Sequence, residues 1–442
     1  MIELGELAVK KALELGATEA EAYLIKGKQF YVALENNDIK LAKSQIMDGI
    51  GIRVFKNKSL GFASVNTFSQ DKVMSAVSNA VRLANLTPKD DANSMPSISN
   101  NYTQVQGIFD SNAEKIGMDE VLKFAQRMLA TALKFDSRIT VDSGIFAGGF
   151  GENAVVNSKG IKLAEMASSF DFGIMGMAHD KGEVSCFQYE FDTTHNIADI
   201  NVENVAMIFA KKVISSLGAK KGESFTGSII LEPDVFADML GVIIAAASAN
   251  NIQKKMSRLV GQLNKQIAVS GLTIEDNGLI AGGAATSTFD REGVARLPLK
   301  IIDKGVLTSY LYNTYCANKD KSQSTGHAVG GTRGLPSIGP SNIIVNAGNK
   351  SQADLIKEIK RGLYVTRLSA QPNPVSGDFS GVVKGGFLIS DGEFKTPVIE
   401  TMISGNIFNL LNQISGLSLE QKKVMSFLVP YCRIEDVSIT SG

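Results

Sequence analysis

The three histidines are the first candidates for chemistry, because imidazole serves both acid–base catalysis and zinc binding near neutral pH. His179 lies in AHDKGE, which is typical of a hairpin turn, and His327 lies in STGHAVGG. His195 follows Glu190 and Asp192 in YEFDTTHN. Strand alternation places Glu190 and Asp192 on one face with His195 beyond it. We interpret these three as solvated polar side chains at a strand end. A metal site built from His179, His195 and Glu190 stays as an alternative.

The cysteines favour structural roles. Cys186, Cys316 and Cys432 are odd in number and far apart, which argues against a disulfide framework and suits a reducing cytosol. Cys316, in LYNTYCANKD, would be a nucleophile if a histidine lay nearby, but a partly buried thiol is the simpler interpretation. No GxSxG elbow is present to expose a nucleophilic serine.

Two glycine-rich segments have the composition of contact loops. GHAVGGTRGLPSIGP (326–340) is neither a Walker loop nor a dinucleotide fingerprint, because no Gly-Lys-Ser/Thr and no strand–Gly–helix unit is present. Its glycines allow close backbone approach, which suits a peptide-contacting loop and equally a tight connection. The same two interpretations stay open for AQPNPVSGDFSG (370–381).

The stretch GVIIAAASANNIQKK (241–255) is inert by comparison. It continues a helix that Pro233 can start and whose N-terminus Asp234 favours. The helix is apolar nearly all round, which predicts a buried position. It ends in alanine, serine and asparagine, with no group able to exchange a proton.

Composition excludes several classes of protein. The chain has 442 residues, which predicts two or three domains, and 45 basic residues balance 45 acidic ones. This balance argues against direct nucleic-acid binding. The longest apolar run, Met239 to Ala249, is too short to span a bilayer, and the N-terminus lacks the pattern of a signal peptide. We expect a cytoplasmic protein without membrane or nucleic-acid partners.

Hydrophobic periodicity and turn residues predict the helices and strands that must position the candidate residues. Helices are expected at 2–16, 70–85, 118–135 and 200–217, with shorter ones near 351–361 and 405–415. A strand meander covers 21–66, with turns at Asn36-Asn37, Asp48-Gly49 and Asn57-Lys58, and a long loop covers 86–111. Strands from Ile139 to about Phe191 are broken at AGGFGEN, NSKG and HDKGE. Lys304-Gly305 and Asp391-Gly392 mark hairpins.

The predicted fold class is α+β. An N-terminal α/β portion, with a mixed sheet flanked by helices, precedes a β-rich C-terminal domain. The expected boundaries are an N-terminal subdomain at 1–110, a middle strand-and-helix subdomain at 111–219, and a C-terminal domain at 220–442.

A series of motifs in the C-terminal half resembles the TldD/PmbA family, also called modulators of DNA gyrase. The stretch 361–414 has a GLYV strand, an SGDFS turn, an LISDGE hairpin and SGN opening a helix. The ending VPYCRIEDVSITSG and the early DGIGIRVFKNKSLGFASVN are similar to the family's closing and first blocks. The resemblance covers nearly the whole chain.

The resemblance implies a cytosolic zinc metallopeptidase assembled from two related chains. TldD-type chains carry zinc in an H-E-x-x-x-H helix that runs like G-V-L-L-H-E-A-V-G-H, with a further cysteine ligand near the C-terminus. In that register, Ala245 replaces the first histidine, Ala246 the glutamate and Asn250 the second histidine. Alanine has no lone pair for zinc. Cys432 lies after the position of the family's ligand cysteine.

The chain is therefore identified as a PmbA/TldE-type member without catalytic, cofactor-binding or metal-binding residues of its own. The expected role is a non-catalytic subunit in the proteolysis of unfolded peptides, with zinc in a TldD-type partner. The expected assembly is a heterodimer with that partner, or a homodimer. Two alternatives stay open: a regulatory binding protein that acts on gyrase or a toxin without proteolysis, and a peptidase that uses other ligands.

Overall fold

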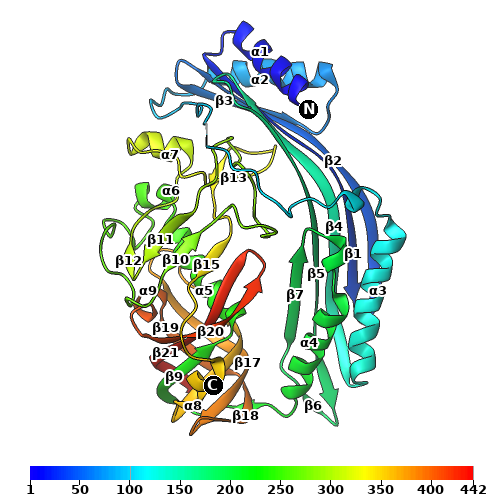
Figure 1. The fold of residues 1–442 in the computed structure, drawn as a ribbon, viewed down its shortest axis with the longest axis vertical. Helices are drawn as coiled ribbons and strands as arrows, with labels where there is room; N and C mark the ends of the chain where they lie inside the picture. The colour runs from blue at the N-terminus through cyan, green and yellow to red at the C-terminus, as the bar shows by residue number, and fades with distance from the viewer. Residues whose placement is uncertain (100, 442) are drawn as a thin grey trace.

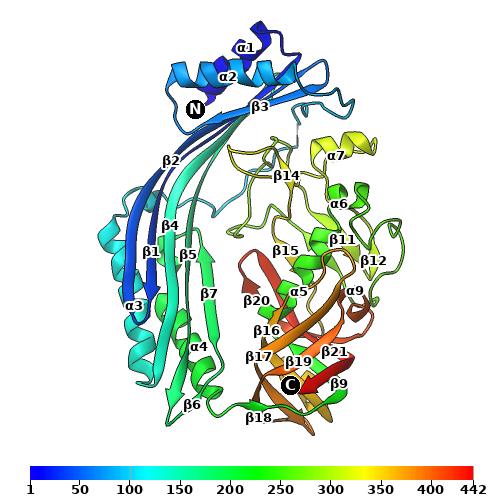
Figure 2. The ribbon, with the colours of Figure 1, turned by 180° about the vertical axis from the view of Figure 1, so that it is seen from behind.

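Two β-sheets organise the chain in the computed structural model, which describes residues 1–99 and 101–441. Asn100 and Gly442, which belong to the predicted loop 86–111 and to the predicted closing strand, lie outside the described residues. The two sheets stand side by side, and the N-terminal helices cap one end of the molecule (Figures 1 and 2).

The N-terminal half builds a seven-stranded sheet in the order β3-β2-β1-β4-β5-β6, with β7 also paired to β5. All the pairings in this sheet are antiparallel. The strands are β1 Glu19–Glu35, β2 Asp38–Lys56, β3 Ser59–Val65, β4 Ile139–Asn157, β5 Lys162–Asp180, β6 Glu183–Val184 and β7 Gln188–Thr194. The helices are α1 Ile2–Glu14, α2 Gln70–Ala84, α3 Met118–Phe135 and α4 Val202–Ser215, with 3₁₀ turns η1 Ser111–Glu114 and η2 Ile197–Asp199.

Two hydrophobic clusters hold these helices against the long sheet. Leu24, Ile52 and Val54 pack with α1 and α2 at one end. Phe146, Phe172 and Ile174 pack with α3 and α4 farther along the strands. The predicted turns at Asn36-Asn37 and Asn57-Lys58 are confirmed, since all four residues have positive φ.

The predicted turn at Asp48-Gly49 is wrong, because β2 continues through it. A Cβ atom at Gly49 would lie 2.7 Å from Thr332 Oγ1, and one at Gly51 would lie 2.5 Å from the Thr332 carbonyl oxygen. Glycine is required here because a loop from the C-terminal half approaches the strand, which sequence alone cannot distinguish from a turn.

The predicted break at AGGFGEN is wrong for a similar reason. β4 runs through it from Ile139 to Asn157. A Cβ atom at Gly149 would lie 2.0 Å from the Lys28 carbonyl oxygen of β1, and one at Gly148 would lie 2.3 Å from the Phe170 ring. The glycines therefore allow close contacts inside a bent sheet, visible in Figure 2.

The C-terminal half builds a twelve-stranded mixed sheet and a two-stranded sheet, β13-β14. The strands are β8 Lys220–Lys221, β9 Phe225–Leu231, β10 Ile274–Asp276, β11 Leu299–Asp303, β12 Val306–Leu307, β13 Ala328–Val329, β14 Ser337–Ile338, β15 Ile343–Val345, β16 Arg361–Ala370, β17 Asp378–Ser390, β18 Glu393–Ile399, β19 Thr401–Asn406, β20 Ile414–Val424 and β21 Phe427–Ser441. The helices are α5 Pro233–Ala246, α6 Ala249–Gln253, α7 Thr314–Lys319, α8 Gln352–Lys357 and α9 Ile407–Leu410. The hairpins at Lys304-Gly305 and Asp391-Gly392 are confirmed by the pairings β11–β12 and β17–β18.

Two helices of this half are shorter than predicted. α8 ends at Lys357 because Arg361 already belongs to β16, and α9 ends at Leu410 because Ile414 pairs with Ile434 of β21. Residues at the ends of the two predicted helices belong to the sheet instead, although their local pattern favours a helix.

The predicted α+β class, with a β-rich C-terminal region, is confirmed. Within the described residues, no helix is long and apolar enough to cross a membrane. One sheet runs through both predicted N-terminal subdomains, and the boundaries proposed at 110 and 219 stay predictions.

Candidate functional site

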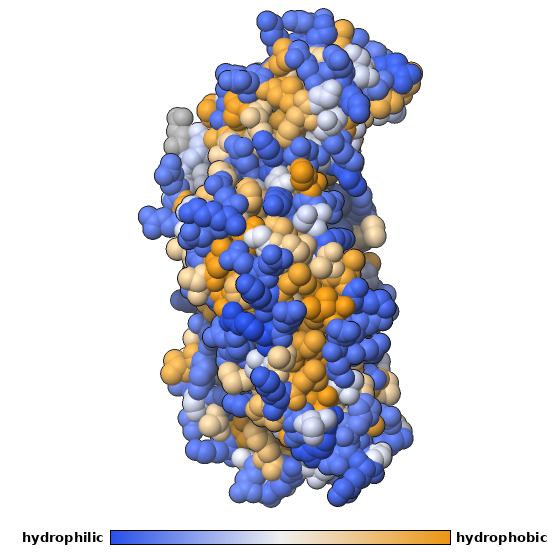
Figure 3. All heavy atoms as spheres, turned by 90° about the vertical axis from the view of Figure 1, so that its right-hand side faces the viewer, coloured by the Kyte–Doolittle hydropathy of each residue, from blue (hydrophilic) through white to orange (hydrophobic). Residues whose placement is uncertain are grey.

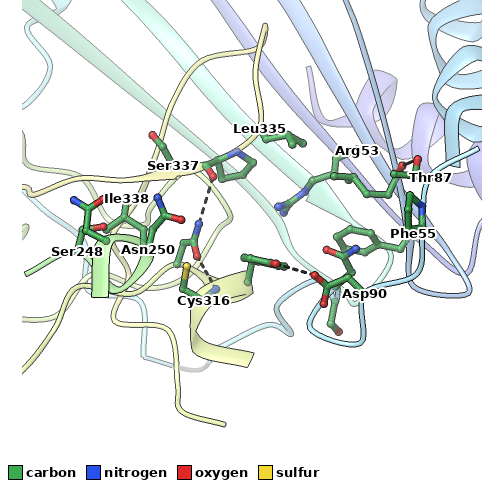
Figure 4. A pocket seen from close by; sticks show the side chains of 18 of the residues that line it. Arg53, Phe55, Thr87, Asp90, Ser248, Asn250, Cys316, Leu335, Ser337 and Ile338 are labelled. Carbon is green, nitrogen blue, oxygen red and sulfur yellow. Dashed lines mark hydrogen bonds between the residues drawn. The ribbon is translucent and has the colours of Figure 1, made fainter. Parts of the chain in front are cut away.

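A cavity of about 660 Å³ lies where the two halves of the chain meet (Figure 4). Arg53 and Phe55 of β2, Leu60 of β3 and the loop residues from Thr87 to Ser94 form the wall from the N-terminal half. The end of α5, the start of α6, the start of α7 and residues 335–338 form the opposite wall. Pockets between domains are common ligand sites, so this cavity is the candidate functional site.

The wall from the C-terminal half contains two of the three positions singled out in the sequence. Ala245 and Asn250 line the cavity, and the Ala245 side chain is exposed there. Ala246 is buried in the hydrophobic core at 1% exposure and does not line the cavity. Among the described residues, the side chain of Asn250 makes no hydrogen bond, so its amide is free to meet a ligand.

Local structure explains this arrangement. α5 begins with Pro233 in its first turn and is buried on most sides. It ends at Ala246 because Ala247 and Ala249 exchange backbone hydrogen bonds of 2.9 Å with Leu311. Ser248 then starts the short helix α6. The break brings Asn250 round to the same cavity as Ala245, although the two are five residues apart.

The residues of this cavity do not fit a zinc ion. Among the described residues, no group of three or more His, Cys, Asp or Glu is placed to hold a metal. Asp90 is the only carboxylate among the described residues that line the cavity, and it already accepts a hydrogen bond from Tyr315. Burial, with a contribution from Asp320, raises the pKa of the Cys316 thiol to about 11, so the thiolate that zinc binds is disfavoured.

Asp90 and Tyr315 link the two walls instead. The Tyr315 hydroxyl donates to Asp90 Oδ2 at 2.8 Å, and Asn318 Nδ2 donates to the Ala92 carbonyl at 2.9 Å. The hydrogen bond from Tyr315 lowers the pKa of Asp90, and the same bond raises the pKa of Tyr315 to about 12. At neutral pH Asp90 is therefore ionised and Tyr315 is neutral. Their hydrogen bond links the two walls of the cavity.

A buried ionic quartet, Glu21, Arg53, Arg291 and Glu292, lies behind the cavity. Arg53 donates to Glu21 at 2.7 Å and to Glu292 at 2.8 Å. Arg291 donates to Glu21 at 2.9 Å, and its guanidinium lies 3.7 Å from the centre of the Tyr23 ring. None of the four side chains is more than 6% exposed. The two positive and two negative charges cancel, and their attraction offsets the cost of removing four ions from water.

The charges of the quartet are fixed by their partners. Burial by itself raises the pKa of Glu21, but Arg53 and Arg291 outweigh it and hold that pKa below its ordinary value. Burial lowers the pKa of Arg53, and Glu21 and Glu292 more than offset this effect. Glu292 also accepts from the Thr314 backbone N–H at 2.8 Å, which connects the quartet to the first residue of α7.

The interpretation of Glu190 and His195 as solvated side chains is wrong, because both are buried. Lys212 and Lys422 donate to Glu190 at 2.9 and 2.7 Å, which joins the two halves of the chain. The His195 ring nitrogens lie 2.5 and 2.9 Å from the carbonyl oxygens of Ser168 and Gly283. Neither nitrogen is left to face a metal, which weakens the alternative ligand set.

The other two histidines are not among the residues that line the cavity. His179 is exposed at the end of β5, opposite Val184. His327 is buried, with Nδ1 2.8 Å from Thr325 Oγ1 and Nε2 3.3 Å from Asp276. His327 therefore suits a structural role in this chain.

The glycine-rich segment 326–340 reaches the cavity. It forms the β13–β14 hairpin, and its residues from Leu335 to Ile338 line the wall. Within the described residues β14 pairs only with β13, so its second edge is open. The segment 370–381 connects β16 to β17 away from the cavity lining, and its role in peptide contact stays a prediction.

Sequence reasoning missed Arg53, Asp90 and the quartet. A signal was available in the run Asp290-Arg291-Glu292, because three consecutive charges between apolar residues are unusual for a buried segment. The partners of that run come from a distant part of the chain, and the run itself does not identify them.

The fold and the cavity together define an α+β protein built on two large sheets, with a ligand-sized pocket between its halves. Sequence models described as PmbA/TldA metallopeptidase domain 1, central domain and C-terminal domain match residues 20–84, 111–217 and 224–441. The chain belongs to this PmbA/TldD family.

Individual relatives agree with this assignment. An uncharacterised protein of Methanocaldococcus jannaschii is 29% identical over 94% of this chain and 96% of its own length. The metalloprotease PmbA of Escherichia coli O157:H7 is 26% identical, over 92% of this chain and 90% of its own.

Solved structures share the fold. TldE from Thermococcus kodakarensis has a TM-score of 0.92 at 23% identity, covering 99% of this chain and 100% of its own. A Bacteroides thetaiotaomicron protein described as a candidate modulator of DNA gyrase has a TM-score of 0.89 at 22% identity, covering 100% of this chain and 98% of its own.

Proposed function

We propose that this chain is a non-catalytic, TldE-type subunit that pairs with a zinc-bearing, TldD-type chain in the proteolysis of unfolded peptides. The observation that carries the proposal is the cavity wall formed by Ala245 and Asn250. By the register that the resemblance implies, these residues stand in place of the family's two histidine ligands; alanine cannot coordinate a metal, and a single amide oxygen is a poor ligand.

The cavity suits the holding of an extended peptide without cleavage. The open edge of β14 offers backbone groups for strand addition, and the free amide of Asn250 lies on the same wall. Phe55, Leu335 and Ile338 add apolar surface for side chains. Strand addition demands little sequence specificity, which is the property that unfolded substrates require. We place this activity in the cytoplasm, where three buried free thiols suit a reducing environment.

The test begins with the chain alone, purified without a metal-binding tag. Less than about a tenth of a zinc equivalent is expected after dialysis, because a lone carboxylate and a protonated thiol bind zinc weakly. One equivalent, with peptidase activity lost in His195→Ala, would overturn the proposal in favour of the other-ligand peptidase.

The second arm uses a TldD-type chain from the same organism. We expect co-elution of the two chains and hydrolysis of an unstructured reporter peptide only by the pair. A cavity-blocking variant, Ala245→Trp, should raise the KM of the pair severalfold without changing its zinc content. Leu86→Trp is the matched control, since Leu86 is 76% exposed outside the cavity. Tight binding to gyrase or to a toxin without co-elution would instead support a regulatory protein.

A further inference from the structure

A second cavity, of about 130 Å³, adjoins the candidate site. Ala245, Ser248 and Ile338 line both spaces, so we call the smaller one the side pocket. Its other walls include Gly241 and Ile244 of α5, Leu311, and Phe427 of β21. Segments that lie far apart in the sequence therefore surround a small recess next to the cavity.

The side pocket is apolar. Among the described residues that line it, Ser248 has the only polar side chain. An apolar cavity of roughly 150 Å³ stays dry and holds a benzene-sized molecule. The side pocket is slightly smaller and suits a side chain of leucine, isoleucine or methionine, whereas a charged group would lose its hydration there. Apolar side chains also gather at mid-height on the outer face of the N-terminal half (Figure 3), but an open face cannot select a side chain by its size.

Gly241 keeps the side pocket open. It lies inside α5, although glycine is among the poorest helix formers. A Cβ atom at this position would meet nothing within 4 Å. Neither a close contact with the described residues nor a positive φ therefore requires glycine here. A larger side chain at this position would extend into the space that the side pocket provides.

Strand β14 presents Ile338 to a bound peptide. Gly339, which follows β14, donates its backbone N–H to the carbonyl oxygen of His327 at 3.1 Å. Backbone hydrogen bonds between antiparallel strands alternate along the chain, so Ile338 directs its own N–H and C=O to the open edge of β14. A peptide residue that pairs with Ile338 places its side chain on the same face as that of Ile338. Because Ile338 lines the side pocket, this side chain is directed to its mouth.

Two polar groups without partners lie where the two spaces meet. Ser248 is only 8% exposed, and its hydroxyl makes no hydrogen bond within the part of the chain that the structure describes. A buried hydroxyl without a partner costs free energy, which a backbone group of a bound peptide would recover. The free amide of Asn250 lies on the same wall of the cavity. Both groups can therefore hold the backbone of a peptide whose side chain enters the side pocket.

We propose that the side pocket receives one aliphatic side chain, of leucine, isoleucine or methionine, from a peptide paired with β14. This inference rests on the proposed function and adds a preference at one position to a backbone pairing that is indifferent to sequence. Aliphatic side chains are mostly buried in folded proteins and become exposed when a chain unfolds. The side pocket therefore recognises a feature that distinguishes unfolded segments from folded surfaces.

Peptide binding to the chain alone tests the proposal. The probes are short, fluorescein-labelled peptides of glycine, serine and threonine with one central guest residue, and fluorescence anisotropy gives their dissociation constants. We expect the leucine guest to bind at least roughly tenfold more tightly than the alanine guest, because it buries three more apolar carbons. An aspartate guest should bind no better than alanine. A tryptophan guest, which exceeds the side pocket, should bind less tightly than leucine.

Substitutions at Gly241 locate the preference. Gly241→Leu fills the side pocket, so the leucine and alanine guests should bind within about twofold of each other. Gly241→Ala adds one methyl group and should reduce the preference by less. Because alanine is the best helix former, this second variant is expected to fold whether or not Gly241→Leu does, and far-UV circular dichroism checks both.

Gly271→Leu is the matched control. Gly271 is exposed and lines neither space, and a Cβ atom there would also meet nothing within 4 Å. This variant should keep the full preference for leucine. Equal binding of the leucine and alanine guests to the wild-type chain, or a preference that survives in Gly241→Leu, would overturn the proposal. Neither result bears on zinc content or on pairing with a TldD-type chain, so the proposed function is tested separately.

Discussion

Two regions that border the same cavity differ sharply in chemistry. The quartet of Glu21, Arg53, Arg291 and Glu292 buries four charges with matched partners. The end of α5 presents Ala245, and the short helix α6 that follows presents Asn250. Charge is therefore retained where it joins the two halves of the chain and is missing from the wall formed by Ala245 and Asn250. The difference indicates that the architecture of the cavity is stabilised independently of any reaction on its wall.

Breaking the quartet should have the largest effect. Among the described residues, Arg53 is the only cation that pairs with the Glu292 side chain, so Arg53→Met is expected to cost about 3–5 kcal/mol of unfolding free energy. The chain has nine tyrosines and no tryptophan, so urea denaturation can be followed by tyrosine fluorescence and far-UV circular dichroism.

Arg127→Met is the control for this prediction. Arg127 and Glu203 form a pair at 2.6 Å with 52% and 37% exposure. Its loss should cost no more than about 1 kcal/mol, because solvent screens exposed pairs. Similar losses in the two variants would show that the quartet does not stabilise the junction.

Placing a glutamate at Ala246, where the resemblance puts the glutamate of the family's zinc motif, should have the next largest effect. Ala246→Glu places a carboxylate in a packed apolar core and should cost about 2–4 kcal/mol. Ala245→Glu adds the same side chain one residue earlier, on the exposed cavity wall, and should cost no more than about 0.5 kcal/mol. Thermal unfolding of the two variants measures the contrast. Equal stabilities would mean that Ala246 can turn toward the cavity.

The smallest effect concerns pH. Asp290 precedes the quartet residues Arg291 and Glu292, and burial, with Glu292, raises the pKa of Asp290 to about 6 from 3.8. Between these pH values the folded chain holds a proton that the unfolded chain has released. Its contribution of up to about 3 kcal/mol is therefore complete below pH 3.8 and is lost as pH rises through 6.

Asp290→Asn isolates this contribution. The stability difference between wild type and variant should fall as pH rises from 4 to 7 in urea titrations. A difference that is constant, or that grows over this range, would contradict the raised pKa of Asp290.

Much of the fold could be predicted from local pattern. The helices at 70–84 and 118–135 and the hairpins at Lys304-Gly305 and Asp391-Gly392 are found at or near the predicted residues. The failures at Gly49 and Gly149 share one cause. Glycine marks both turns and close packing, and only the neighbours in space decide between them.

The sequence by itself determined the inert end of α5, because the chemistry of a side chain is a property of residue type. Tertiary structure decided which of these residues line the cavity and which one is buried in the core. Ala245 and Asn250 face a cavity and Ala246 faces the core, because the bridge to Leu311 breaks the helix between them. Tertiary structure also joined Arg53 to Glu292, which lies 239 residues away. Local pattern carries no information about contacts at that separation, since they form only when both sheets have folded.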